Sequence, residues 1–165
     1  MQVQLPDTAA TEAAGETLAQ LLPTDELVVY LQGELGAGKT TLVRGVLHGL
    51  GHRRRVPSPT YTLIEPYALA GRQLQHLDLY RIADAEELAY IGVRDLSGVM
   101  FIEWPERGGK SLPPADLVCR LRLGPPGRLL EVTGRSPAGK KLSRQWLKAL
   151  QALPLVVESE SEVKL

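Results

Sequence analysis

One segment of the sequence has the residue types and the spacing needed to hold a chain of phosphates. Gly33 and Gly38 bracket four residues, and Lys39 and Thr40 follow directly, which completes the phosphate-loop pattern. Glycines let the backbone curl so that several N–H groups point inward at phosphate oxygens. Lys39 would reach the β- and γ-phosphates, and the Thr40 hydroxyl would bind magnesium. The pattern predicts a nucleotide site formed by Leu35, Gly36, Ala37, Gly38, Lys39, Thr40 and Thr41.

Phosphoryl transfer also needs a carboxylate near the magnesium ion, and the sequence offers two candidates. Glu103 ends the apolar run 99–102, as the carboxylate of a Walker-B-like strand does. Asp78 lies in an alternating run that puts His76, Asp78 and Tyr80 on one face of a strand. Such a face is typical of a half-exposed sheet, but beside a phosphate loop it favours the wall of a site. A metal site made by His76 and Asp78 alone is not expected, because a third ligand has no evident source.

The segment Ser58-Pro59-Thr60 follows the helix that the phosphate loop would begin. In nucleotide-dependent switch proteins, this region carries a hydroxyl group that senses the γ-phosphate. The same residues would also suit a rigid turn before a strand. The sequence leaves both interpretations open.

The elements that must position these residues alternate between strands and helices. Residues 27–31 form a continuous apolar run, which predicts a strand buried on both faces directly before the loop. Residues 41–50 predict a helix directly after it, closed by Gly51. The other predicted elements are a strand at 3–5, a helix capped by Asp7 or Thr8 and stopped by Pro23, a strand pair at 60–67 and 74–80 that turns at Gly71, a short helix with capping-box spacing at 84–87, a strand at 99–102, a hairpin from 117–123 and 129–133, and a helix opening at Ser136-Pro137.

This order of elements predicts an α/β, P-loop NTPase-like fold. Its central, mostly parallel sheet would be flanked by helices, with a C-terminal β-hairpin and helix added. We expect one domain over residues 1–153, because a chain of 165 residues suits a single core and no internal repeat or linker interrupts it. The acidic segment 154–165 is expected to be a disordered tail.

Composition argues against several classes of partner. Nineteen basic residues balance nineteen acidic ones, so no global field would draw the chain onto nucleic acid or a membrane. No apolar run approaches the roughly 20 residues of a membrane helix, and the N-terminal residues lack a signal-peptide pattern, so we expect a cytoplasmic protein.

The single cysteine, Cys119, excludes an internal disulfide and is expected to be a core residue rather than a nucleophile.

The kind of nucleotide protein is narrowed by the motifs that the sequence lacks. A guanine-specific switch protein normally carries an Asn-Lys-x-Asp segment, and this chain contains no asparagine. Asp95 and Gly98 match the Asp-x-x-Gly switch pattern, but they precede a strand rather than follow one. A stand-alone small-molecule kinase with an unidentified acceptor is an alternative, although Arg81, Arg94 and Arg107 are scattered and no lid segment stands out. A nucleotide-gated binding module whose hydrolysis is incidental is another.

Four segments, taken in order, resemble the TsaE (YjeE) family, the bacterial ATPase of tRNA threonylcarbamoyladenosine synthesis. They are residues 33–41 around the phosphate loop, Ser58-Pro59-Thr60-Tyr61-Thr62-Leu63, His76-Leu77-Asp78-Leu79-Tyr80-Arg81, and Ile102-Glu103-Trp104. The resemblance spans about residues 3–135. The phosphate loop alone is generic, whereas the serial order of all four motifs at these spacings is highly specific.

The resemblance implies an α/β P-loop fold that binds ATP or ADP with Mg2+. It implies catalytic roles for Lys39, Asp78 and Glu103, metal binding by Thr40 and Glu103, and an adenine position near Pro6 and Thr8. Candidates for switch or partner contacts are then Ser58, Thr60, His76, Tyr80, Arg81 and Trp104. In this family, ATP hydrolysis serves TsaB and TsaD, and TsaD threonylcarbamoylates adenosine 37 of tRNAs that read codons starting with A. Contact with tRNA would be indirect, and no membrane would be involved.

The run Arg53-Arg54-Arg55 departs from the family by being unusually basic. Most such runs are solvated loops. The alternative is a contact surface for an acidic partner or for tRNA phosphates. Three charges are few beside the roughly 6–10 phosphate contacts of a strong nucleic-acid binder. If the run is a contact surface, we therefore favour a protein partner over tRNA.

Overall fold

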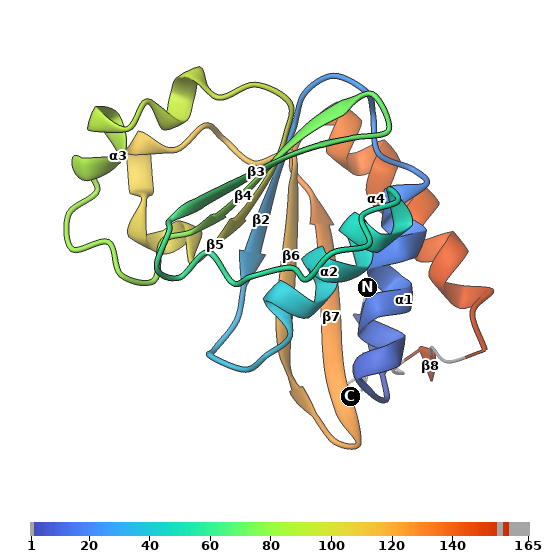
Figure 1. Cartoon of the computed structure of the whole chain (residues 1–165). Helices are drawn as coiled ribbons and strands as arrows, with labels where there is room; N and C mark the ends of the chain where they lie inside the picture. The colour runs from blue at the N-terminus through green and yellow to red at the C-terminus, as the bar shows by residue number, and fades with distance from the viewer. Residues whose placement is uncertain (1, 155–156, 159–165) are drawn as a thin grey trace.

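The computed structural model describes residues 2–154 and 157–158, which form one twisted sheet with helices packed against it (Figure 1). The strands are β1 (Gln2–Leu5), β2 (Leu27–Gln32), β3 (Ile64–Leu69), β4 (Arg72–Asp78), β5 (Val99–Glu103), β6 (Leu117–Gly124), β7 (Gly127–Gly134) and β8 (Val157–Glu158). The helices are α1 (Thr8–Ala19), α2 (Lys39–Gly49), α3 (Glu87–Tyr90) and α4 (Pro137–Gln151), with 3-10 turns at Val93–Asp95, Pro105–Arg107 and Gly109–Ser111. None of the helices in this described part is long and apolar enough to cross a membrane.

The strand order across the sheet is β3-β4-β5-β2-β6-β7-β1-β8. The central strands β4, β5, β2 and β6 pair in parallel, and the pairings outside them are antiparallel. The predicted α/β fold, with a parallel centre flanked by helices and a C-terminal hairpin and helix, is therefore confirmed. The β6–β7 hairpin belongs to the same sheet and carries β1 on its outer side.

Apolar side chains form a core on each face of the sheet. On one face lie α1, α2 and α4, where Gly15 of α1 and Gly45 of α2 let the two helix backbones touch. The buried Trp146 of α4 joins this core and donates its indole N–H to Ala14 O at 3.0 Å. The segment around α3 supplies Leu88 to a smaller core on the other face. Both faces of the central strands are thus covered.

Cys119 lies in the larger core, as its alternating run predicted. It is fully buried on β6, and burial raises the pKa of its thiol to about 12. A thiol that stays protonated at neutral pH is a poor nucleophile. The prediction of a core role for this cysteine is confirmed.

Alternation along β4 and β5 decides which side chains face α2. Leu77 joins the smaller core, so His76 and Asp78 point to the opposite face of β4. The parallel register pairs Asp78 with Glu103, which places the two carboxylates beside each other at the strand ends. His76 and Leu77 are both fully buried, so the alternative of a half-exposed sheet is wrong here. Tyr80 lies beyond the end of β4.

The helix ends follow ordinary capping chemistry. Asp7, rather than Thr8, caps α1, and its side chain accepts a hydrogen bond from Ala10 N at 2.8 Å. Ser136 caps α4 by accepting a hydrogen bond from Gly139 N at 3.0 Å. α2 begins at Lys39, whereas the predicted start was residue 41. It ends before Gly51, as predicted.

Three other predicted boundaries or caps are also wrong. α1 ends at Ala19, before Pro23 is reached, because the chain turns there and buries Leu22 in the core. β3 begins at Ile64 instead of residue 60, since Leu63 adopts a positive φ of 69° that breaks an extended run. No capping box forms at 84–87, because the Asp84 carboxylate accepts a hydrogen bond from Glu86 N at 2.9 Å instead.

The predicted tail is ordered at one point. Val157 and Glu158 form β8, which pairs antiparallel with Val3 and Gln4 of β1. The expectation of disorder is therefore wrong for these two residues, because the free edge of β1 offers backbone groups that an extended segment can pair with. Residues 155, 156 and 159–165 of the predicted tail lie outside the described part of the chain.

Candidate nucleotide-binding site

A cavity of about 510 Å3 opens where the parallel strands β2, β5 and β4 end. Most of the predicted site residues line it, namely Pro6, Thr8, Leu35, Gly36, Ala37, Gly38, Lys39, Thr40, Thr41, Ser58, Thr60, Asp78, Glu103 and Trp104. The lining is completed by Asp7, Thr11, Pro126, Gly127 and Arg128, which the sequence did not predict. A volume of this size suits a small-molecule ligand such as a nucleotide.

The phosphate loop joins β2 to α2, and its glycines are required by its geometry. Gly38 has a left-handed φ of 108° and is the N-cap residue of α2, where no side chain caps the helix. The first N–H groups of a helix have no partner within the helix, and here the residues that carry them line the cavity. A side chain at Gly33 would collide with the carbonyl oxygen of Leu121 on β6. The loop can therefore bring backbone donors close to an anion.

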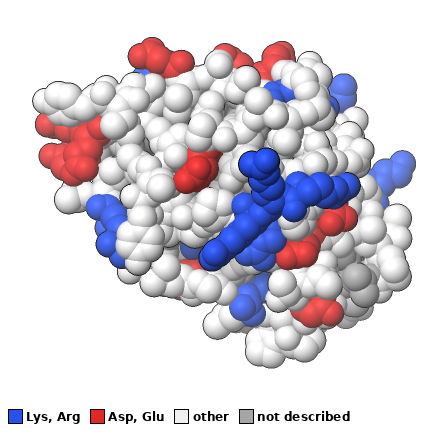
Figure 2. All heavy atoms as spheres, viewed as in Figure 1, with Lys and Arg blue, Asp and Glu red and all other residues white. Residues whose placement is uncertain are grey.

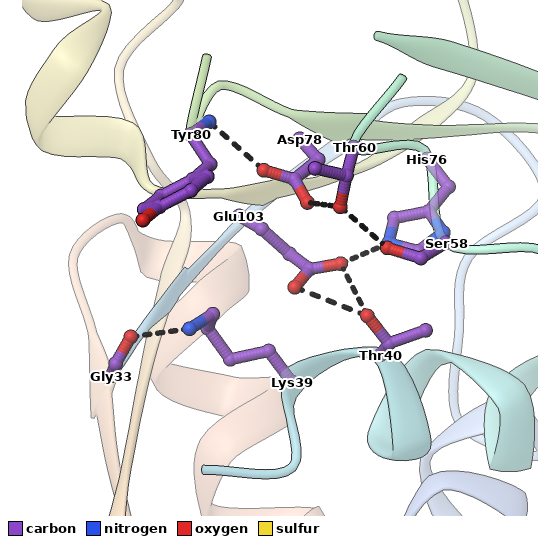
Figure 3. Close-up of polar contacts among 9 residues, drawn as sticks. All are labelled: Gly33, Lys39, Thr40, Ser58, Thr60, His76, Asp78, Tyr80 and Glu103. Atoms are coloured by element: carbon purple, nitrogen blue, oxygen red, sulfur yellow. Dashed lines mark hydrogen bonds and ion pairs between the residues drawn. The ribbon is translucent and has the colours of Figure 1, made fainter. Parts of the chain in front are cut away.

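Lys39 lines the cavity and is only 4% exposed. Its ammonium group donates hydrogen bonds to Gly33 O and, at 3.0 Å, to Glu34 O. It also lies 4.4 Å from the ring centre of Trp104. Burial lowers the pKa of Lys39, and the nearby carboxylates act in the opposite direction. The contacts direct one cation to the inside of the loop (Figure 3).

Thr40, Glu103 and His76 form a chain of hydrogen bonds that is buried at its Glu103–His76 end (Figure 3). Thr40 Oγ1 donates to the Glu103 carboxylate, at 3.0 Å from Oε2 and 3.3 Å from Oε1. His76 Nε2 lies 2.6 Å from Glu103 Oε2. Since an ionised carboxylate only accepts, we assign the proton to Nε2, and Nδ1 has no partner among the described residues. His76 therefore contacts Glu103 but does not itself line the cavity.

A second chain of hydrogen bonds ties the Ser58–Thr60 segment to Asp78. The two hydroxyl groups of Ser58 and Thr60 lie 2.8 Å apart, and Thr60 donates to Asp78 Oδ2 at 2.9 Å. The other oxygen of Asp78 accepts a hydrogen bond from Tyr80 N at 2.9 Å. The segment is therefore a turn, as one interpretation held, and its hydroxyl groups also reach the cavity. Sensing of the γ-phosphate stays a prediction.

Tyr80 and Arg81 lie outside the cavity, because the chain turns away after β4. The Tyr80 ring packs on Trp104 with ring centres 5.0 Å apart. The Arg81 guanidinium lies 4.2 Å from the ring centre of the exposed Tyr61. Among the three polar residues predicted to form a site wall, only Asp78 does so. Partner contacts by Tyr80 and Arg81 stay predictions.

The donors at one end of the cavity fit a magnesium ion. Thr40 and Glu103 present a hydroxyl and a carboxylate, the hard oxygen ligands that magnesium prefers. No group of three His, Cys, Asp or Glu side chains that would hold a metal by itself occurs within the described residues. Magnesium at nucleotide sites is usually bound by one or two protein ligands together with phosphate oxygens, so this small donor set fits.

Among the lining residues that the sequence did not predict, Arg128 has the one basic side chain. It is the second residue of β7, the second strand of the hairpin, and its guanidinium donates to Gly36 O at 3.0 Å, at the tip of the phosphate loop. The β1–β7 register pairs it with Leu5, which brings it beside the Pro6–Thr8 segment. No motif surrounds it in the sequence. Only the Gly-Pro-Pro-Gly turn at 124–127 indicated where this strand begins.

Comparisons with known proteins give a consistent result. Residues 5–129 match the family model described as threonylcarbamoyl adenosine biosynthesis protein TsaE. A protein of Haemophilus influenzae named tRNA threonylcarbamoyladenosine biosynthesis protein TsaE is 41% identical over 145 residues, which cover 84% of this chain and 92% of that protein. A Synechocystis protein with the same name is 42% identical over 113 residues, which cover 65% of this chain and 71% of that protein.

The fold is also similar to that of a solved structure. The crystal structure of Bacillus subtilis YdiB superimposes with a TM-score of 0.72 at 26% sequence identity. The superposition covers 90% of this chain and 95% of the other. The two chains therefore share their overall fold over most of their length.

Proposed function

Because the chain belongs to the TsaE family of threonylcarbamoyl adenosine biosynthesis proteins, we propose that it binds and hydrolyses ATP as an accessory subunit of that pathway. In this proposal it acts on the TsaB–TsaD complex, which threonylcarbamoylates adenosine 37 of tRNAs that read codons starting with A. Its own contact with tRNA is indirect. The chain supplies ATP hydrolysis and does not form the threonylcarbamoyl bond.

The observation that carries the proposal is the set of groups around the phosphate loop. Lys39 provides one buried cation, and Thr40 in the first turn of α2, together with Glu103 at the end of β5, provides oxygen atoms that would bind a metal ion. Asp78 provides a second carboxylate, only 4% exposed, at the end of the neighbouring strand. Cation, metal ligands and a further carboxylate are the groups that phosphoryl transfer requires.

Each residue then has a distinct task. The loop N–H groups and Lys39 would bind the phosphates, and Thr40 and Glu103 would hold magnesium. Bound magnesium would neutralise charge on the β- and γ-phosphate oxygens. His76 would orient Glu103 through the 2.6 Å contact. Asp78, fixed by Thr60 and by Tyr80 N, would orient the attacking water, and the adenine would lie toward Pro6 and Thr8.

We expect the isolated protein to be a poor ATPase that TsaB and TsaD stimulate. Among the described residues, Arg128 is the one arginine that lines the cavity, and it bonds to the loop tip rather than to the end that holds Thr40 and Glu103. An added arginine at the γ-phosphate can raise such a rate by roughly 10³–10⁵. Phosphate release would be measured with and without TsaB–TsaD and magnesium. Equal rates for the isolated and the assembled protein would contradict the expectation.

The same assay separates the ATPase from a small-molecule kinase. With ATP labelled on the γ-phosphate, an ATPase releases the label as inorganic phosphate. A kinase transfers it to an acceptor and turns over only when that acceptor is present. Release of inorganic phosphate that rises with TsaB–TsaD, and with no added acceptor, would support the proposed function.

Arg128→Ala is expected to weaken nucleotide binding by roughly five- to tenfold, because a charge-assisted contact near the phosphates is lost. The effect should be smaller than that of removing Lys39, since Arg128 is partly exposed to solvent. Arg122→Ala is a matched control, because Arg122 is exposed on the paired strand β6 and does not line the cavity. Titration with a fluorescent ADP analogue measures both. Equal affinities of the two variants would show that Arg128 only supports the loop.

A further inference from the structure

A second hollow, of about 580 Å3, adjoins the nucleotide cavity, and four arginines are among the residues that line it. Arg44 and His48 of α2 lie on one side, and Arg53, Arg54 and Arg55 of the following loop lie on the other. We call this hollow the basic groove. Figure 2 shows basic side chains gathered where the loop after α2 crosses the front of the molecule, with acidic side chains close beside them.

Positive charge in the basic groove is only partly compensated. Arg44 pairs with Glu12 at 3.3 Å. Arg53, Arg54 and Arg55 are exposed, and none of them makes an ion pair with another described residue. Three adjacent arginines repel one another, although the chain as a whole carries no net charge. The groove therefore presents an uncompensated charge that an anionic partner would neutralise.

We propose that the basic groove docks an acidic segment of a protein partner. Guanidinium groups bind carboxylates through two parallel hydrogen bonds, and several of them around a hollow suit acidic side chains that enter it. The inference deepens the proposed function and rests on it for the identity of the partner, the TsaB–TsaD complex.

The composition of the groove favours protein over RNA. Besides four arginines and His48, it is lined by Thr40, Val56, Pro57 and Ser58, and it offers no Phe, Tyr or Trp on which a base would stack. Its four arginines are fewer than the roughly 6–10 phosphate contacts of a strong nucleic-acid binder.

The groove is physically continuous with the nucleotide site. Thr40 and Ser58 line both hollows. The loop that carries the arginines continues through Pro57, Ser58 and Pro59 to Thr60, which bonds to Asp78. Prolines restrict the backbone, so a shift at the arginines reaches the hydroxyl groups at the cavity. Docking in the groove and the nucleotide state should therefore affect each other, and by thermodynamic linkage the effect is reciprocal.

The test compares two triple variants that lose the same charge. Arg53→Gln, Arg54→Gln and Arg55→Gln are combined in one variant. The control combines Lys140→Gln, Lys141→Gln and Arg144→Gln, which are exposed positions of α4. At low salt the groove variant should bind TsaB–TsaD about tenfold more weakly, whereas the control should match the wild type. The difference should shrink as salt rises, and nucleotide affinity should stay unchanged because Lys39 is untouched.

A second arm uses probes that do not depend on the partner's identity, namely fluorescein-labelled poly-glutamate and poly-uridylate. Stronger binding of poly-glutamate by the wild type and the control than by the groove variant would support the proposal. If the wild type bound poly-glutamate in this way but failed to bind TsaB–TsaD, only the identity of the proposed partner would be overturned. Selective loss of poly-uridylate binding would assign the groove to RNA and overturn the proposal. Equal behaviour of all three proteins in both arms would overturn it too, because the arginines would then be a solvated loop.

Discussion

Replacing Lys39 with alanine is expected to abolish tight ATP binding. The change removes the one cation that the structure directs to the inside of the phosphate loop, where it is 4% exposed and bonds to Glu34 O at 3.0 Å. A charge-assisted contact of this kind contributes about 1.5–3 kcal/mol net. That energy corresponds to a loss of affinity of roughly 10- to 150-fold. Equilibrium titration with ATP and with ADP measures the loss.

Two further variants make this result interpretable. Lys140→Ala removes an exposed cation from α4 and should leave the affinity unchanged. Lys39→Arg keeps the charge but replaces the compact ammonium group, which contacts the Gly33 carbonyl and the Trp104 ring, with a larger planar guanidinium, so it should also bind poorly. Circular dichroism would show that each variant is folded. ATP affinity of Lys39→Ala within about twofold of the wild type would rule out the phosphate-loop assignment.

Replacing Glu103 with alanine is expected to reduce ATP hydrolysis in the TsaB–TsaD complex by roughly 10²–10³, a range typical for removing one group that stabilises the transition state. Nucleotide affinity should fall much less. Glu103 accepts hydrogen bonds from Thr40 and His76, so its loss removes a proposed metal ligand and the partner of a buried imidazole. Phosphate release measured against magnesium concentration should show a higher magnesium requirement.

A conservative variant guards against a simple loss of folding. Glu103→Gln keeps the volume of the side chain and its acceptor oxygen but removes the charge that a metal ion needs, so it should fold and still hydrolyse ATP slowly. Asp78→Ala should also impair hydrolysis more than binding. Its magnesium requirement should change less, because Asp78 bonds to Thr60 rather than to Thr40. If either alanine variant hydrolysed ATP at the wild-type rate, the replaced residue would have only a structural role.

Much of the site was predictable because its parts depend on short stretches of chain. The phosphate loop needs glycines at fixed positions, and the buried run 27–31 before it indicates a strand. Alternation along residues 76–78 placed His76 and Asp78 on one face, and the structure confirms this placement. The caps of α1 and α4 follow from single side chains, Asp7 and Ser136, that bond to backbone groups a few residues away.

Other features were decided only by tertiary structure. Arg128 reaches the loop tip because β7 pairs with β1, a strand that lies more than a hundred residues away in sequence. His76 supports Glu103 instead of lining the cavity, because β4 and β5 lie side by side in parallel. Residues 60–63 turn rather than extend, since Thr60 bonds to Asp78 and Leu63 takes a positive φ.

The physical reason for this division is the range of the interactions involved. Backbone turns, caps and side-chain alternation are set by neighbours within a few residues, so the residue types record them directly. The choice of which strands pair depends on how the apolar faces of the whole chain pack into two cores. That choice is a sum over many distant contacts, and no local pattern contains it. The basic groove belongs to the same class, because it exists only where the loop at 53–58 folds back against α2.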